Sequence, residues 1–153
     1  MFSKRNLTIV LIAAVFSGCG LFEDEGSLEL ATDSTGYEPG SPITITAKNN
    51  TSDVIYYSTC MPTMLQELSR QNVVESVGFP TCACLCTAEL KPGQSWEYEV
   101  DATWLWQNMG PSQPKIGPDY QFLLQFFRDK DMTKLVDRSD LTTNTFQFIP
   151  TTQ

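Results

Sequence analysis

The chain has 153 residues, with 10 basic residues against 18 acidic residues and no histidine, which gives a net charge of −8 at pH 7. This acidic balance excludes a nucleic-acid partner, because phosphate binding needs clustered lysine and arginine. The lack of histidine excludes a Ser-His-Asp triad and a histidine-ligated metal site.

The first predicted element is an export signal. Lys4 and Arg5 are followed by a nearly unbroken apolar run over residues 7–16. That run is shorter than the roughly 20 residues that a membrane-spanning helix needs, and it fits the core of a cleaved signal. Small residues then precede Cys19.

Small residues followed by a cysteine resemble the lipobox of bacterial lipoproteins. The resemblance implies that residues 1–18 are a lipoprotein signal peptide and that Cys19 carries several acyl chains, palmitate among them. Residues 19–26 are then a lipidated tether. In this family an aspartate after the cysteine signals inner-membrane retention, so Gly20 implies the outer membrane. We expect a cell-envelope protein that is attached to the membrane by the lipid on Cys19.

Residues 27–153 are predicted to form one domain. Apolar and polar residues alternate with period two in short segments, which is typical of half-buried strands, and turn signals such as Pro39-Gly40 and Pro92-Gly93 separate them. An alternative for residues 62–70 is a short helix. The pattern predicts an all-β fold, an antiparallel immunoglobulin-like β-sandwich of about seven strands. The predicted strand segments are 28–32, 43–48, 54–60, 65–70, 72–77, 96–101, 120–127 and 143–148.

The same alternation predicts which side chains form the core. One face of each strand is expected to be buried, and its neighbours are expected to face solvent or a sheet edge. The predicted core residues are Trp96, Tyr98, Phe122, Leu124, Phe126 and Phe146. The predicted outward residues are Glu97, Glu99, Gln121, Gln125 and Gln147.

A second resemblance concerns the domain. The segments 37–40, 43–46, 49–51 and 90–95 are similar in spacing to bacterial immunoglobulin-like domains, and the intracellular proteinase inhibitor family is the nearest named group. The resemblance implies a sandwich over most of residues 27–149. It also gives an alternative function, a proteinase-inhibitor-like module that would present the loop Gln107–Pro118.

Four cysteines remain after Cys19, and in an exported chain an even number favours disulfides. Residues two apart on a strand lie about 6.6 Å apart, too far for neighbours in this set to bond along an extended strand. We therefore expect Cys60 to join one of the other three, with Cys82 favoured. The remaining two either pair across a turn or stay reduced. The cysteines are Cys60, Cys82, Cys84 and Cys86.

An alternative is that these four thiolates bind zinc or copper(I), which would make the chain a thiolate metal-binding lipoprotein. Their spacing lacks the two separate pairs that are usual in tetrathiolate zinc sites. Oxidation outside the cytoplasm also favours disulfides. We expect no cofactor.

Two further groups have a functional and a structural interpretation. Trp104 and Trp106 precede the long loop and are a possible binding surface for sugar or peptide, although indoles two apart on a strand more often fill a core. Glu97, Glu99 and Asp101 are compatible with a calcium patch, but a solvated strand face explains them equally well.

The sequence contains no Gly-x-Ser-x-Gly elbow and no glycine-rich phosphate loop. We therefore expect a protein that is not an enzyme. The predicted function is a lipid-anchored cell-envelope protein with a binding or structural role and a possible protein or peptide partner.

Overall fold

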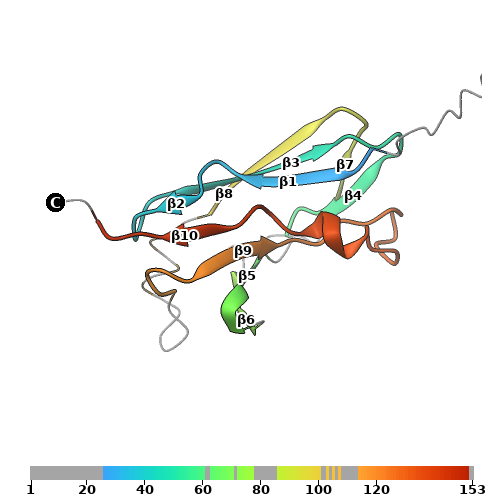
Figure 1. Ribbon diagram of the computed structural model, residues 1–153. Helices are drawn as coiled ribbons and strands as arrows, with labels where there is room; N and C mark the ends of the chain where they lie inside the picture. Colours follow the sequence, from blue (N-terminus) through green and yellow to red (C-terminus); the bar gives the residue numbers. More distant parts are fainter. Residues whose placement is uncertain are drawn as a thin grey trace, which may run out of the picture.

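The computed structural model describes residues 26–60, 63–70, 72–77, 86–100, 103, 105, 107 and 114–151. Within these residues the regular secondary structure is nearly all β-strand, and the strands form a sandwich (Figure 1). The expected all-β fold class is confirmed. No helix in this part of the chain is long and apolar enough to cross a bilayer.

Two sheets form the layers. One is antiparallel with strand order β1-β3-β8, and the other has the order β2-β10-β9-β5-β6, with the β10–β2 pair parallel. Strands β4 and β7 form a separate antiparallel pair. The strands are β1 Leu28–Thr32, β2 Gly36–Tyr37, β3 Ile43–Asn49, β4 Ile55–Ser58, β5 Thr63–Glu67, β6 Asn72–Val77, β7 Thr87–Leu90, β8 Ser95–Val100, β9 Asp119–Leu123 and β10 Phe146–Phe148. Two 3-10 turns are η1 Leu68–Arg70 and η3 Arg138–Leu141.

The continuation of β9 joins the β4–β7 pair to the second layer. The backbones of Tyr56 and Phe127 exchange two hydrogen bonds of 2.8 Å. On its other side Phe127 forms a bridge with Leu135. The segment from Asp119 to Phe127 therefore runs through the second layer, first between β10 and β5 and then between β4 and Leu135.

The core lies between the sheets and follows the predicted alternation. In β3 the residues Ile43, Ile45 and Ala47 are fully buried, while the residues between them are more exposed. The opposite layer contributes an aromatic group in ring-to-ring contact, which adds to the stability gained by burial. This group consists of Tyr120, Phe122, Phe146 and Phe148.

The burial of the side chains confirms the predicted register, although two predicted core residues are less buried than expected. Phe122, Leu124, Phe126 and Phe146 are buried, while Glu97, Glu99 and Gln147 are exposed and Gln121 and Gln125 are half-buried. Trp96 and Tyr98 are only half-buried. They lie on β8, an edge strand of its sheet, so the opposite layer covers them on one side only.

Some predicted strand bounds are wrong. Strand β9 ends at Leu123 rather than Phe127, because the following backbone pairs irregularly with Leu141 and Val136. The helix alternative for residues 62–70 is wrong, since β5 occupies most of that segment. Ten short strands are present in the described residues, against about seven expected.

The Pro-Gly turns are confirmed. Gly40 and Gly93 have φ of 85° and 76°, a left-handed conformation that glycine adopts without steric cost. These two turns fix the starts of β3 and β8 and so align the first sheet.

Candidate functional site

The described chain enters the sandwich at one end, which we call the tether end. Gly26 passes against the Asn50 backbone, and a Cβ at Gly26 would lie 1.9 Å from the Asn50 oxygen. Only glycine fits this close approach. Strand β1 then begins opposite Asn49. The turns after β3 and β7 and the loop that follows Phe127 lie at this same end (Figure 1).

A buried asparagine organises the tether end. The Asn49 side chain is 0% exposed, and its amide nitrogen donates to the carbonyl oxygens of Asp53 and Leu90, each at 2.8 Å. Its amide oxygen accepts from the backbone nitrogen and hydroxyl of Thr51 at 3.0 and 2.7 Å. All hydrogen-bonding groups of this buried amide are thus paired, as burial of a polar group requires. The network ties β3, its following turn and β7 into one unit.

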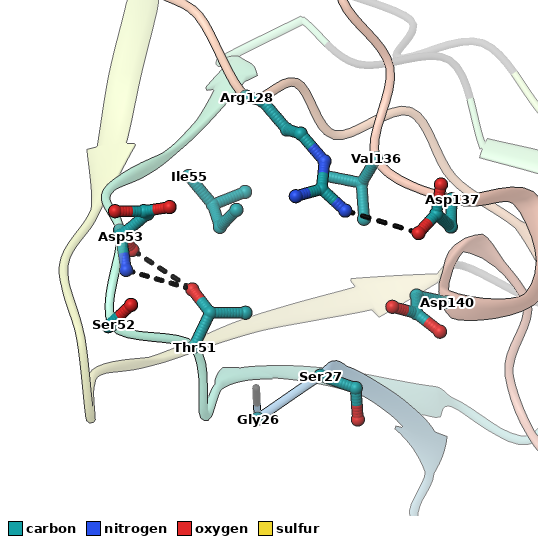
Figure 2. Close-up of a pocket in the computed structure, with 10 residues that line it drawn as sticks. All are labelled: Gly26, Ser27, Thr51, Ser52, Asp53, Ile55, Arg128, Val136, Asp137 and Asp140. Atoms are coloured by element: carbon teal, nitrogen blue, oxygen red, sulfur yellow. Dashed lines mark hydrogen bonds and ion pairs between the residues drawn. The ribbon is translucent and has the colours of Figure 1, made fainter. Parts of the chain in front are cut away.

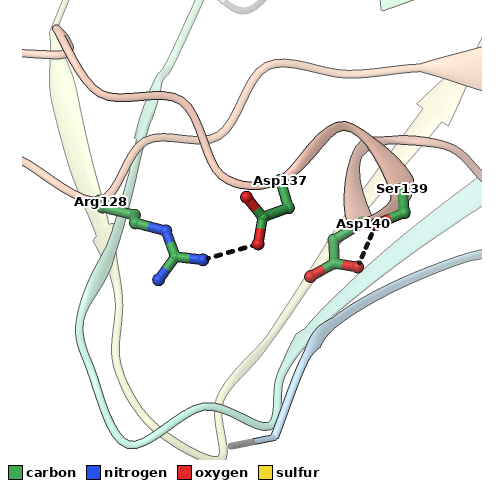
Figure 3. A network of polar contacts seen from close by, with 4 residues as sticks. All are labelled: Arg128, Asp137, Ser139 and Asp140. Carbon is green, nitrogen blue, oxygen red and sulfur yellow. Dashed lines mark hydrogen bonds and ion pairs between the residues drawn. The ribbon is translucent and has the colours of Figure 1, made fainter.

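A small polar pocket of about 130 Å³ opens beside this network (Figure 2). An exposed ion pair crosses it, with 3.1 Å between the Arg128 guanidinium and the Asp137 carboxylate (Figure 3). Asp140 accepts a hydrogen bond from Ser139 at 3.2 Å. The lining residues are Gly26, Ser27, Thr51, Ser52, Asp53, Ile55, Arg128, Val136, Asp137 and Asp140.

The chemistry of this pocket is limited. Exposed ion pairs such as Arg128–Asp137 contribute at most about 1 kcal/mol. The Thr51 hydroxyl donates to the Asn49 amide oxygen and the Asp53 carbonyl, neither of which is a base that could activate it as a nucleophile. Within the described residues, no three carboxylate or cysteine side chains converge in a way that could hold a metal ion.

A larger apolar groove of about 380 Å³ adjoins the pocket and shares Val136 and Asp137 with it. Leu123 is half-buried on the outward side of β9, and Leu135 is 52% exposed. A concave surface with mostly apolar walls and few polar groups is typical of a binding site. The groove is lined by Met64, Leu123, Leu124, Gln125, Leu135, Val136, Asp137, Arg138 and Leu141.

The structure describes only some of the predicted site residues. Cys60 and Cys86 lie at the open end of the β4–β7 pair, where the Thr59 nitrogen donates to the Cys86 oxygen at 2.8 Å, and both cysteines are disulfide-bonded. The partner of each sulfur stays a prediction. Residues that lie outside the described part are Cys19, Cys82, Cys84, Asp101, Trp104 and Trp106.

The surroundings of the two tryptophans differ from the prediction. The neighbouring residues Thr103, Leu105 and Gln107 have helical backbone rather than a strand, and Leu105 is fully buried. Near the end of the predicted loop, Ile116 forms an isolated bridge with Phe148. Glu97 and Glu99 are exposed on β8, in agreement with a solvated face.

Sequence reasoning missed the apolar groove, although a signal for it exists. Leu123 stands between Gln121 and Gln125 on the face that alternation assigns to solvent. A single apolar residue on a polar face is common, and only a contiguous apolar patch indicates a binding surface. Its partner across the groove, Leu135, comes from a separate loop that only the tertiary structure brings close.

Comparisons with known proteins assign no family. No family model matches the chain, and no curated protein matches it. One similar solved structure is a Paenibacillus sp. cycloisomaltooligosaccharide glucanotransferase complexed with cycloisomaltoheptaose, with 16% identity and a TM-score of 0.41. The alignment covers 84% of this chain and 14% of that chain, so this chain spans a small part of the enzyme's length. A likeness at this level assigns neither activity nor substrate.

Proposed function

We propose that this chain is a lipid-anchored cell-envelope protein whose β-sandwich binds a protein or peptide partner and catalyses no reaction. The observation that carries the binding role is the apolar groove, where Leu123 is half-buried and Leu135 is exposed. An apolar side chain of a partner buried there gains about 25 cal/mol for each Å² removed from water.

The anchor is supported by the sequence before the domain. Cys19 follows the apolar signal and stands seven residues before Gly26, where the described sandwich begins. We expect the wild-type protein in the outer-membrane fraction and a processed Cys19→Ser variant in the soluble fraction. A processed variant that still fractionates with membranes would refute the anchor.

The binding role is tested separately on the soluble Cys19→Ser protein. Peptides selected from a random library should lose at least about tenfold in affinity when Leu135→Ser is introduced, because a buried leucine contributes roughly 1.5–3 kcal/mol. The matched control is Ile116→Ser, since Ile116 is 50% exposed and does not line the groove. Equal losses in both variants, or no selected peptide, would contradict this site.

One observation favours proteinase inhibition as a second candidate function. The end of the predicted inhibitory loop is braced, because the Lys115 nitrogen donates to the Tyr120 hydroxyl at 2.8 Å and Ile116 pairs with Phe148. A braced, exposed loop is the kind of element that an inhibitor presents. Incubation with serine proteinases of differing specificity should then show inhibition that Ile116→Asp removes, and full proteinase activity would exclude this role.

A further inference from the structure

The segment Arg128–Arg138, which we call the basic hairpin, differs in charge from the rest of the molecule. It holds four of the ten basic residues of the chain but only three of its eighteen acidic residues. The hairpin therefore carries a net charge of +1, while the whole chain carries −8. Its basic residues are Arg128, Lys130, Lys134 and Arg138.

Two of the three carboxylates of the hairpin, Asp129 and Asp137, are engaged within it, while the third, Asp131, is exposed. The Asp129 carboxylate accepts from the backbone nitrogens of Thr133 and Lys134 at 3.0 and 2.7 Å, and also from the Thr133 hydroxyl. Asp137 pairs with Arg128. Lys130 and Lys134 are exposed and form no close ion pair with another described residue, although the Thr133 hydroxyl and, to a smaller extent, the Lys134 charge lower the pKa of Asp129.

The tip of the hairpin has a fixed shape. The Arg128 nitrogen donates to the Lys134 oxygen at 2.7 Å, and Met132 has a φ of 54°. Met132 is half-buried and lies between the two lysines in sequence. The tip therefore presents two lysines and the exposed Asp131 carboxylate around a half-buried methionine, so any contact with the polar surface of a bilayer depends on the two cations.

The basic hairpin lies beside the point where the predicted lipidated tether joins the domain, which favours the membrane as its partner. Arg128 and Asp137 line the same pocket as Gly26, so the hairpin lies where the tether reaches the domain (Figures 1 and 2). From Cys19 to Gly26 a fully extended chain spans at most about 25 Å. A lipid on Cys19 would thus hold Gly26, and the base of the hairpin beside it, at most about this distance from the membrane.

We infer that the tip of the basic hairpin, through Lys130 and Lys134, contacts anionic phospholipid headgroups of the membrane that anchors the chain. This inference rests on the proposed lipid anchor. The lipid supplies the attachment, and the two lysines orient the domain. The groove, which lies beside the base of the hairpin at Leu135, would then open close to the membrane surface.

The test is hydrogen–deuterium exchange of the lipidated full-length protein. The protein is reconstituted in vesicles of phosphatidylcholine with phosphatidylglycerol, in vesicles of phosphatidylcholine alone, and compared with soluble Cys19→Ser protein. We expect amides 129–134 to exchange more slowly only on the anionic vesicles. Lys134→Gln should reduce that protection about fivefold, the effect of one cation at an anionic surface. Lys130→Gln combined with it should reduce the protection further.

Lys115→Gln is the matched control, because Lys115 is an exposed lysine outside the hairpin. It should leave the protection unchanged. Equal exchange on anionic and neutral vesicles would overturn the inference. Exchange at amides 129–134 that is as slow in the soluble protein as on the anionic vesicles would also overturn it.

Failure of the anchor is distinguishable from failure of the hairpin contact. If the full-length protein does not float with vesicles, the proposed function fails first. The hairpin is then tested with a chain in which a histidine tag replaces residues 1–19 and binds nickel-chelating lipids. Protection of amides 129–134 on anionic vesicles would still support the contact, and its loss would refute it.

Discussion

At the scale of single residues, Asn49 is the side chain on which the tether end depends most. It is completely buried, and its amide pairs two backbone carbonyls and one threonine. Asn49→Ala would leave the carbonyls of Asp53 and Leu90 without this donor, and each unsatisfied buried group costs about 1–3 kcal/mol. We expect the free energy of unfolding, measured by urea denaturation, to fall by about 2–4 kcal/mol.

The neighbouring residue provides the control for this measurement. Asn50 is exposed, and its side chain donates one hydrogen bond to Glu29 at 3.2 Å. Asn50→Ala should change stability by less than about 0.5 kcal/mol. Similar losses in the two variants would mean that burial of Asn49 is not what makes it important.

A second residue-scale prediction concerns pH. Burial, together with the hydrogen bond from the Tyr37 hydroxyl to Asp33 at 2.6 Å, raises the pKa of Tyr37 to about 12. The protonated phenol is favoured in the folded state, so its contribution is present below pH 10 and is lost as pH rises from 10 to 12. Because Asp33 is exposed, we expect a loss of about 1–2 kcal/mol over that window.

Tyr37→Phe isolates this effect. The variant lacks the ionisable hydroxyl, so its unfolding free energy should fall less between pH 10 and 12 than that of the wild type, as followed by urea unfolding at each pH. Parallel pH curves for the two proteins would show that another group controls alkaline stability.

At the scale of elements, the basic hairpin depends on one carboxylate. The pKa of Asp129 is lowered, chiefly by the hydrogen bond from the Thr133 hydroxyl. A lowered pKa means that the stabilising contribution is present above the unfolded pKa of about 3.8 and is lost as pH falls through the lower folded value. We expect Asp129→Ala to speed amide exchange at Thr133 and Lys134 while leaving the unfolding transition nearly unchanged.

Asp131→Ala serves as its control, since Asp131 is an exposed carboxylate of the same tip. It should leave exchange at Thr133 and Lys134 as in the wild type. Faster exchange in both variants would indicate that the shape of the tip depends on total charge rather than on the Asp129 hydrogen bonds.

The β9 segment shows that sequence periodicity predicts the burial of side chains but does not predict where a strand ends. Burial alternates from Asp119 to Phe127, as the sequence predicts, although the regular strand ends at Leu123. The alternation of apolar and polar residues predicts which side chains face the core. It continues after Leu123, where the backbone no longer forms regular strand hydrogen bonds. The end of β9 is decided by Leu141 and Val136, whose backbones take over the pairing.

At the scale of the whole molecule, we expect a disulfide of Cys60 to stabilise the β4–β7 end. Cys60 and Cys86 are both bonded, and we predict that Cys60 joins one of Cys82, Cys84 and Cys86. Peptide mapping by mass spectrometry without reduction should find the Cys60 peptide linked. Reduction should lower the free energy of unfolding by about 2–4 kcal/mol. A Cys60 peptide that is unlinked in protein from the cell envelope would refute the pairing.

The sequence by itself determined the fold class, the register of the core strands and the exclusion of histidine chemistry. Each of these depends on local information, namely the period of apolar residues, turn residues such as Gly93, and composition. The lipid anchor on Cys19 is likewise a sequence prediction, and it remains to be tested.

Only the tertiary structure decided the groove and the environment of Asn49. The groove is lined by Met64, Leu123 and Leu135, which come from three separate segments. No local sequence pattern predicts that these residues lie close together. Asn49 appears in the sequence as part of a polar turn, yet it is buried because Leu90 and Asp53 pack around it and satisfy its amide. Such sites depend on long-range packing, which a periodic pattern does not encode.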